Sequence, residues 1–197
     1  MAYGMIIDKT ICVGCHGCSM ACKLSNGTPP GVHRSRVLKN ITGTYPKVTS
    51  EITPMLCMHC AEPPCYEVCP TEATQIADNG IVTIDKETCI GCNACVLACP
   101  YDARTMCSLD VGYYGGAFNQ FEEIAYKNML DGTVDKCDFC YSRAAEGEAP
   151  EPVCVAACKV EARVFDDLDK IKSLAASEGG EQLLPEYGPS VYYVGKR

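Results

Sequence analysis

The sequence has no tryptophan, only three histidines, and no run of about 18 apolar residues of the kind that spans a bilayer. Its first residues contain neither a basic run followed by an apolar stretch nor a twin arginine, so we expect no export signal or membrane anchor of its own. Basic residues are also scarce, because 17 Lys and Arg stand against 25 Asp and Glu, which gives a formal charge of -8. This balance argues against non-specific binding to nucleic acid or anionic lipid, and the lack of a long apolar run argues against direct membrane insertion.

Cysteine, in contrast, is abundant: the 197 residues, enough for one or two domains, include 17 of them. In a short secreted protein this content would indicate a disulfide scaffold. The count is odd, however, and all but Cys107 fall into four tight quartets, whose spacing suits metal ligation better than long-range cross-links. The quartets are Cys12, Cys15, Cys18 and Cys22; Cys57, Cys60, Cys65 and Cys69; Cys89, Cys92, Cys95 and Cys99; and Cys137, Cys140, Cys154 and Cys158.

The third quartet has a specific spacing. Two, two and three residues separate its cysteines, and Pro100 follows the last one. In bacterial ferredoxins with this spacing, one tight loop places three thiolates on a 4Fe-4S cube, and the fourth cysteine ligates a second cluster. Zinc sites also use cysteines two residues apart, but they need no third cysteine at the same interval. A Rieske centre would replace two cysteines by histidines, and none is missing, so we expect His16 and His59 to pack or to form hydrogen bonds.

The first and third quartets belong to an internal repeat. They share the same spacing, a preceding strand-like run with an Asp-Lys pair, and a glycine, Gly14 or Gly91, before the second cysteine. We expect these glycines to have positive φ or to approach another segment closely. A second repeat follows the other last cysteines: Cys99 precedes Pro-Tyr-Asp-Ala-Arg, Cys158 precedes Lys-Val-Glu-Ala-Arg, and Cys69 precedes Pro-Thr-Glu-Ala.

The order of the quartets predicts how they pair. Residues 74–84 read as strand, Asn-Gly turn and strand, so a hairpin joins the second quartet to the third. The first quartet is left to pair with the fourth, whose long gap includes an acidic, proline-bearing loop at 146–152. We predict an α+β fold of two ferredoxin-like domains nested in sequence, an outer domain of residues 1–50 and 125–197 and an inner domain of residues 51–124 with an insertion at 107–124. Further strands are expected at 34–41, 46–55 and 190–194, and helices at 121–130 and 167–176.

Within each pair, the last cysteine of one quartet is expected to ligate the cluster of the other. This rule predicts four ligand sets: Cys12, Cys15, Cys18 with Cys158; Cys57, Cys60, Cys65 with Cys99; Cys89, Cys92, Cys95 with Cys69; and Cys137, Cys140, Cys154 with Cys22. Cys107 belongs to no set, and we expect it to be a buried thiol that packs as a small hydrophobic side chain.

A resemblance to a known family extends over nearly the whole chain. It is carried by the order of the quartets, by the wider spacing of the second and fourth, and by two runs, Cys57-Met58-His59-Cys60 and Glu161 to Asp169. The chain resembles the iron-sulfur electron-transfer subunits of the molybdopterin oxidoreductases, the dimethyl sulfoxide reductase family. The resemblance implies four 4Fe-4S clusters in a row, docked on a large catalytic subunit with a molybdenum or tungsten pterin cofactor. Some members also dock on a quinone-reactive membrane subunit. The chain would then be no enzyme itself, and would stay in the cytoplasm or be exported with a signal-bearing catalytic partner.

The chain departs from the family pattern at two lysines. Lys159 stands where the family often has proline after the last cysteine of the fourth quartet, and Lys23 follows Cys22. In some relatives tryptophan replaces one cysteine ligand of the third quartet, and the cluster there is 3Fe-4S. This chain has no tryptophan and a complete third quartet, so we expect four cubanes.

Two other functions compete with this one. A free soluble polyferredoxin that serves several redox partners would use the same cysteines and would differ only in how permanently it docks. A self-contained redox enzyme would need an incompletely ligated cluster, a phosphate-binding glycine loop or a nucleophile–base pair, and the sequence indicates none of these.

Overall fold

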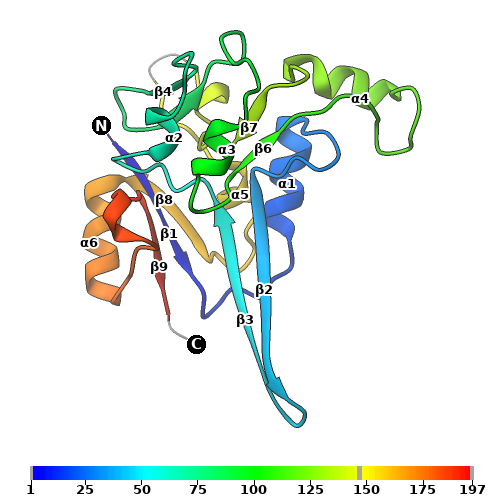
Figure 1. Cartoon of the computed structure of the whole chain (residues 1–197). Coiled ribbons are helices and arrows are strands. Elements are labelled where there is room, and N and C mark those ends of the chain that lie inside the picture. The colour runs from blue at the N-terminus through cyan, green and yellow to red at the C-terminus, as the bar shows by residue number, and fades with distance from the viewer. Residues whose placement is uncertain (1, 146–147, 196–197) are drawn as a thin grey trace.

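The computed structural model describes residues 2–145 and 148–195, so the first two residues of the expected loop at 146–152 lie outside the described part. Short helices and strands surround the cysteine-bearing loops, and a small sheet and a long hairpin extend from this centre (Figure 1). The mixture of helices and strands agrees with the predicted α+β class. No helix within the described ranges is long and apolar enough to cross a bilayer.

A three-stranded sheet joins the two ends of the chain. β1 (Tyr3–Asp8) lies in the middle, with β8 (Arg163–Asp167) antiparallel on one side and β9 (Val191–Val194) parallel on the other. α6 (Leu168–Glu178) lies beside this sheet and packs its apolar residues against β1 and β9 (Figure 1). The strand and helix expected near the C-terminus are therefore confirmed.

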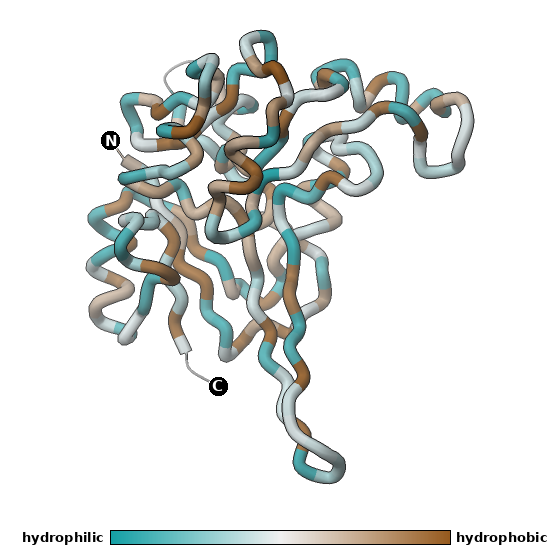
Figure 2. Tube along the Cα trace, viewed as in Figure 1, coloured by the Kyte–Doolittle hydropathy of each residue, from teal (hydrophilic) through white to brown (hydrophobic). Residues whose placement is uncertain are grey.

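β2 (Ser35–Thr44) and β3 (Lys47–Leu56) form an antiparallel hairpin where two strands were expected. The end of β3 is buried and leads directly into the second quartet, whereas the outer half of the hairpin projects from the body (Figure 1). Residues 39–51 are exposed, and apolar residues recur among polar ones along this outer half (Figure 2).

Two smaller sheets surround the second and third quartets. β4 (Thr74–Ile76) and β5 (Val82–Ile84) form the hairpin expected from the sequence. β6 (Arg104–Met106) pairs antiparallel with β7 (Val134–Lys136), a pairing that the sequence did not indicate. This second sheet attaches a segment from the predicted outer domain to a strand that follows the third quartet.

The helix expected in the insertion is shorter than predicted. α4 (Gln120–Ala125) passes into a 3-10 turn, η1 (Tyr126–Asn128). Tyr126 and Met129 pack against the thiol of Cys107, and the turn that brings them there ends the regular helix.

Four helices carry cysteines of the quartets. α1 (Gly17–Asn26) packs on α5 (Val153–Ala156), and α2 (Pro64–Glu67) packs on α3 (Ala94–Ala98). These contacts bring the first quartet beside the fourth and the second beside the third. Two further 3-10 turns are η2 (Tyr141–Arg143) and η3 (Pro185–Tyr187).

Candidate iron-sulfur cluster sites

The loops of the first and third quartets have the same backbone conformation. Gly14 and Gly91 have φ of +70° and +67°, and the residues before the following helices, His16 and Asn93, have φ of +61° and +62°. A Cβ on Gly91 would lie 2.0 Å from the carbonyl oxygen of Gly132, so this loop also approaches a neighbouring segment closely. The positive φ expected at both glycines is confirmed, and the sequence repeat is also a structural repeat.

Two cavities lie between the second and third quartets, and each is lined by three cysteines of one quartet and the last cysteine of the other. One is lined by Cys57, Cys60, Cys65 and Cys99, and the other by Cys69, Cys89, Cys92 and Cys95. In the described ranges, no three His, Cys, Asp or Glu side chains form a group that could hold a single metal ion. The cysteines that line each cavity are those that the sequence assigned to one ligand set.

The contact between α1 and α5 brings Cys22 to the fourth quartet. Burial, and then the negative charges of Cys154 and Cys140, raises the pKa of Cys22 to about 12. Burial, followed by the charges of Cys22 and Cys154, likewise raises the pKa of Cys137 well above its ordinary value. These four thiols therefore share one buried environment.

The first quartet approaches the end of the fourth. A Cβ on Gly17 would lie 3.5 Å from the Sγ atom of Cys15 and 3.7 Å from the carbonyl oxygen of Ala157. Ala157 immediately precedes Cys158, so the last cysteine of the fourth quartet lies next to the loop of the first.

The chemistry of these thiols fits an iron-sulfur cluster. Burial, and then the charges of Cys57, Cys65 and Cys99, raises the pKa of Cys60 to about 12. Four thiolates around one cavity repel one another and require positive charge between them. Iron supplies that charge, and a thiol that coordinates a metal loses its proton.

In three quartets, a turn after the last cysteine also suits the binding of an iron-sulfur cluster. The third residue after the cysteine has positive φ in each: Glu72 (+56°), Asp102 (+51°) and Glu161 (+53°). The following main-chain N–H donates to the cysteine sulfur: Ala103 to Cys99 (3.4 Å), Ala162 to Cys158 (3.3 Å) and Ala73 to Cys69. Such bonds stabilise thiolate charge.

Two buried arginines complete the sites and were not identified from the sequence. Arg104 lines both cavities between the second and third quartets, and its Nη2 donates to the Sγ atom of Cys65 over 3.0 Å. Burial would lower the pKa of Arg163, but the negative charges of Cys154 and Cys18 outweigh it and raise that pKa. Each pair of quartets thus has one buried arginine beside both of its cysteine sets. The shared Asp/Glu-Ala-Arg ending of the repeat is the sequence signal that could have found them.

His59 supplies an unpaired donor. Its Nδ1 accepts the N–H of Val82 over 3.1 Å, so the proton of the neutral ring lies on Nε2. Burial, and then the charges of Lys136 and Arg104, keeps the pKa of His59 well below its ordinary value. The buried Nε2 has no hydrogen-bond partner among the described residues. Met58 and Cys60, on either side of His59 in the chain, line the cavity of the second quartet, and an anionic cluster there would suit a buried N–H group.

The four sets differ in exposure. Cys15 and Cys92 are exposed, whereas the cysteines of the second and fourth quartets are buried apart from the half-buried Cys69 and Cys158. Apolar side chains at equivalent positions of the two exposed loops point to solvent: Val13 (62%) and Met20 (64%) in the first, Ile90 (67%) and Leu97 (87%) in the third. The first and third quartets therefore lie at the surface and the other two lie inside.

Cys107 lies apart from these sites. It is fully buried and packs with Val32, Tyr126 and Met129, as expected for a thiol that behaves as a small hydrophobic side chain.

The chain matches protein families of one class. Residues 48–109 and residues 81–159 each match a family described as a 4Fe-4S dicluster domain. The two matches overlap at the third quartet and together include the second, third and fourth. The loops and cavities described above belong to an iron-sulfur protein of the dicluster class.

Similarity to individual proteins extends over almost the whole chain. It is 37% identical to a putative dimethyl sulfoxide reductase iron-sulfur subunit of Halobacterium salinarum, over 98% of this chain and 78% of that protein. It is 39% identical to a subunit of the selenate reductase of Mesobacillus selenatarsenatis, over 96% of this chain and 70% of that protein. It is 34% identical to the arsenate respiratory reductase iron-sulfur subunit of a Shewanella species, over 98% of this chain and 96% of that protein.

The chain belongs to the iron-sulfur subunits of the molybdopterin oxidoreductases, which confirms the resemblance found in the sequence. It is an electron-transfer subunit that carries 4Fe-4S clusters and is not the catalytic subunit.

Proposed function

We propose that this subunit holds four 4Fe-4S clusters and relays electrons to or from a large catalytic subunit with a molybdenum or tungsten pterin cofactor. The observation that carries the proposal is the meeting of three cysteines from one quartet with the last cysteine of its neighbour at each inner cavity. Two-cluster ferredoxins share their ligands in this way. The chain accepts and releases single electrons, and the partner performs the chemistry on the substrate.

The proposed ligand sets each combine three cysteines of one quartet with the last of another. They are Cys12, Cys15, Cys18 with Cys158; Cys57, Cys60, Cys65 with Cys99; Cys89, Cys92, Cys95 with Cys69; and Cys137, Cys140, Cys154 with Cys22. The lining of the two inner cavities supports the middle two sets. The shared burial of Cys22 with the fourth quartet supports the last.

These sets make two ferredoxin-like units nested in sequence. The outer unit, residues 1–50 and 125–197, is supported by the sheet of β1, β8 and β9 and by the packing of α1 on α5. The inner unit, residues 51–124, is supported by the packing of α2 on α3 and by the β4–β5 hairpin. The pairing of β6 with β7 would join the two units.

The exposure of the sets gives an order for the electron path. The set with Cys15 and the set with Cys92 form the two ends, because only these loops expose a cysteine within the described ranges. Cys57 and Cys137 lie in one core cluster and their charges interact, so their two sets adjoin in the middle. The path runs from the first-quartet site to the fourth, then to the second, and ends at the third.

The exposed apolar residues around each end site fit docking surfaces for redox partners. The catalytic subunit docks at one end, and the other end faces a second electron carrier, which in a membrane-bound complex is a quinone-reactive subunit. The chain lies on the same side of the membrane as the catalytic subunit, either in the cytoplasm or on the far side of the membrane after export with that subunit.

Anaerobic purification of the tagged chain from its own host tests this function. We expect a stoichiometric complex with a pterin-containing subunit that persists through size exclusion, and substrate turnover only in that complex. Val13→Glu places a charge at the first-quartet end of the electron path, and Ile90→Glu places one at the third-quartet end. Because the catalytic subunit docks at one of these ends, one of the two variants should release it. Val111→Glu, at another exposed position, is the matched control.

A free polyferredoxin gives a different result. The chain would then elute alone, with all its clusters, and neither charged variant would change its elution. Substrate turnover by the isolated chain with an artificial electron donor would contradict both functions.

A further inference from the structure

Asn26 has the role at Cys22 that a main-chain amide has at the last cysteine of the other three quartets. Its side-chain Nδ2 donates to the Sγ atom of Cys22 over 3.5 Å and to the carbonyl oxygen of the same residue over 2.8 Å. In the other quartets the donor is the N–H of an alanine, again four residues after the cysteine. All four last cysteines therefore receive an N–H group from position i+4, and only Cys22 receives it from a side chain.

The length of α1 explains the difference. In the other quartets the third residue after the last cysteine has positive φ and ends the helical path of the chain. The main-chain N–H of the fourth residue, an alanine, is then available to donate to the cysteine sulfur. α1 (Gly17–Asn26) instead continues for a full turn beyond Cys22, so the main-chain N–H of Asn26 is committed to the carbonyl of Cys22 in the helix. A proline at position 23, one residue after the cysteine, would interrupt this helix, which accounts for Lys23 there.

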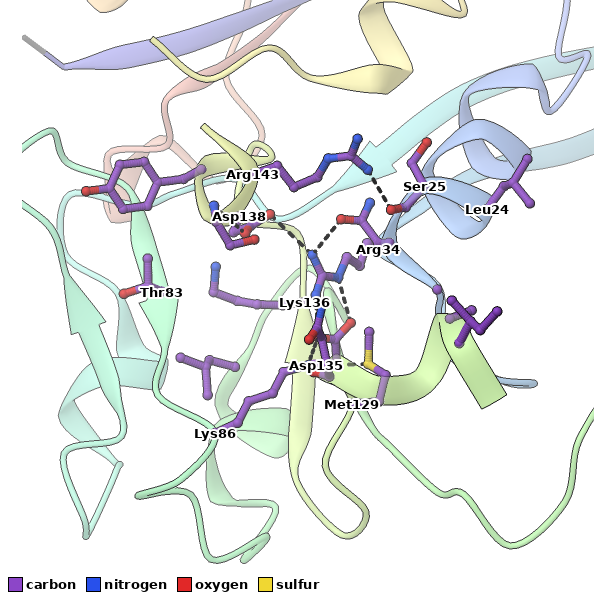
Figure 3. Close-up of a pocket in the computed structure, with 18 of the residues that line it drawn as sticks. Leu24, Ser25, Arg34, Thr83, Lys86, Met129, Asp135, Lys136, Asp138 and Arg143 are labelled. Carbon is purple, nitrogen blue, oxygen red and sulfur yellow. Dashed lines mark hydrogen bonds and ion pairs between the residues drawn. The ribbon is translucent and has the colours of Figure 1, made fainter. Parts of the chain in front are cut away.

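Arg34 fixes the orientation of the Asn26 amide. The Nη1 atom of Arg34 donates to the Oδ1 atom of Asn26 over 3.1 Å. A guanidinium has only donors, so the atom that faces it must be the amide oxygen, and the NH₂ group must face Cys22. Arg34 is itself held by a two-pronged ion pair with Asp135, at 2.7 and 2.8 Å (Figure 3).

The same arginine reaches the loop that carries the other cysteines of this set. Arg34 Nη1 donates to Asp138 Oδ1 over 3.3 Å, and Asp138 lies between Cys137 and Cys140 (Figure 3). The side chains of Arg34 and Asp135 are only 9% and 2% exposed. The arginine thus joins the helix of Cys22 to the loop of the fourth quartet. Although little of its side chain is exposed, Arg34 lines a cleft of about 720 Å³ together with Asn26 and Asp138.

We propose that Asn26 sets the reduction potential of the cluster held by Cys22, Cys137, Cys140 and Cys154, and that Arg34 is the positioning residue that aims its amide. The inference rests on the proposed function. Reduction adds one electron from the neighbouring cluster, with no bond made or broken, and the same electron leaves to the next cluster. An N–H group aimed at the thiolate stabilises the added negative charge and raises the potential.

The test is a redox titration of the complete complex, followed by electron paramagnetic resonance. Asn26→Leu removes the donor at similar size, and we expect one of four midpoint potentials to fall while the other three stay and the iron content is unchanged. A tenfold change in the reduction equilibrium is expected, which for one electron is about 59 mV. Asn26→Asp keeps the acceptor for Arg34 but presents a carboxylate to Cys22, so the fall should be larger. Ser25→Ala, at the adjacent exposed position, should change none of the four.

Unchanged potentials in both Asn26 variants, with all clusters present, would overturn this inference and leave the proposed function standing. Loss of the same cluster in both variants, with Ser25→Ala intact, would also overturn it, because Asn26 would then be required for assembly rather than for tuning. Fewer than four clusters in the unaltered complex would instead contradict the proposed function.

Discussion

The imidazole ring of His59 stacks on the phenyl ring of Phe139, with ring centroids 3.8 Å apart and an interplanar angle of 28°. The two residues occupy the same place in two loops, directly before the second cysteine of their quartets, and both have positive φ. The stack therefore joins the loop of the second quartet to the loop of the fourth, where the two proposed cluster sites adjoin.

We predict that His59→Ala destabilises the protein by about 3 kcal/mol, because it removes a buried ring and leaves the N–H of Val82 without its acceptor. For a chain of this size the melting temperature should fall by roughly 6–12 °C. The measurement is thermal unfolding followed by cluster absorbance. His33→Ala, at an exposed position, is the control and should melt like the unaltered chain. Equal melting of both variants would show that the stack contributes nothing.

Arg34→Ala should be far more damaging than Arg36→Ala, although both residues form ion pairs. Burial would raise the pKa of Asp135, but Arg34 outweighs it and holds that pKa below its ordinary value. Loss of Arg34 leaves the buried Asp135 with Lys86, at 3.1 Å, as its remaining ion-pair partner, and leaves Asp138 without its ion pair to Arg34, at a combined cost of about 3 kcal/mol. Arg36 pairs with Asp102, whose side chain is 77% exposed, so its loss should cost less than about 1 kcal/mol. Denaturant titration compares the two, and similar costs would contradict this assignment.

Cys107→Ser should leave the iron content at about sixteen per chain, four for each of four cubanes. The substitution places a hydroxyl in an apolar cluster and should cost about 1–3 kcal/mol of stability. Iron and sulfide analysis after anaerobic purification checks the result. Cys95→Ser is the contrasting variant and should lose or convert one cluster. A loss of about four irons in the Cys107 variant would mean that the ligand sets are wrongly assigned.

Gly91→Ala should deplete the cluster built by the third quartet. The new Cβ would lie 2.0 Å from the carbonyl oxygen of Gly132, so the loop must move. Gly132→Ala is the matched control, because its φ is similarly positive, at +70°, but no atom lies within 4 Å of the added Cβ. It should cost only about 1–2 kcal/mol and keep all its iron. Iron analysis of both variants separates the clash from the backbone preference.

The sequence indicated the family, the quartets and the hairpin at 74–84, because cysteine spacing and Asn-Gly turns are local signals. It also indicated the positive φ of Gly14 and Gly91, since the repeat placed a glycine at the same point of both loops. These features depend on residues that are close together in the chain.

The features that the sequence did not indicate depend on residues far apart in the chain. Arg104 and Arg163 become part of the sites only because the fold buries them beside cysteines of two quartets. The β6–β7 pairing joins strands of three residues, too short to leave a periodic pattern. The early end of α4 follows from packing around Cys107, which overrides the local preference for a longer helix.

The proposed ligand sets each take their fourth cysteine from another quartet. The most direct test of this exchange is anomalous diffraction at the iron edge from crystals of the complex. We predict four compact iron sites, with the sulfur of Cys22 bonded to the same cluster as Cys137, Cys140 and Cys154. The sulfur of Cys158 should bond to the cluster of the first quartet. A structure with Cys22 on the cluster of Cys12, Cys15 and Cys18 would contradict the account.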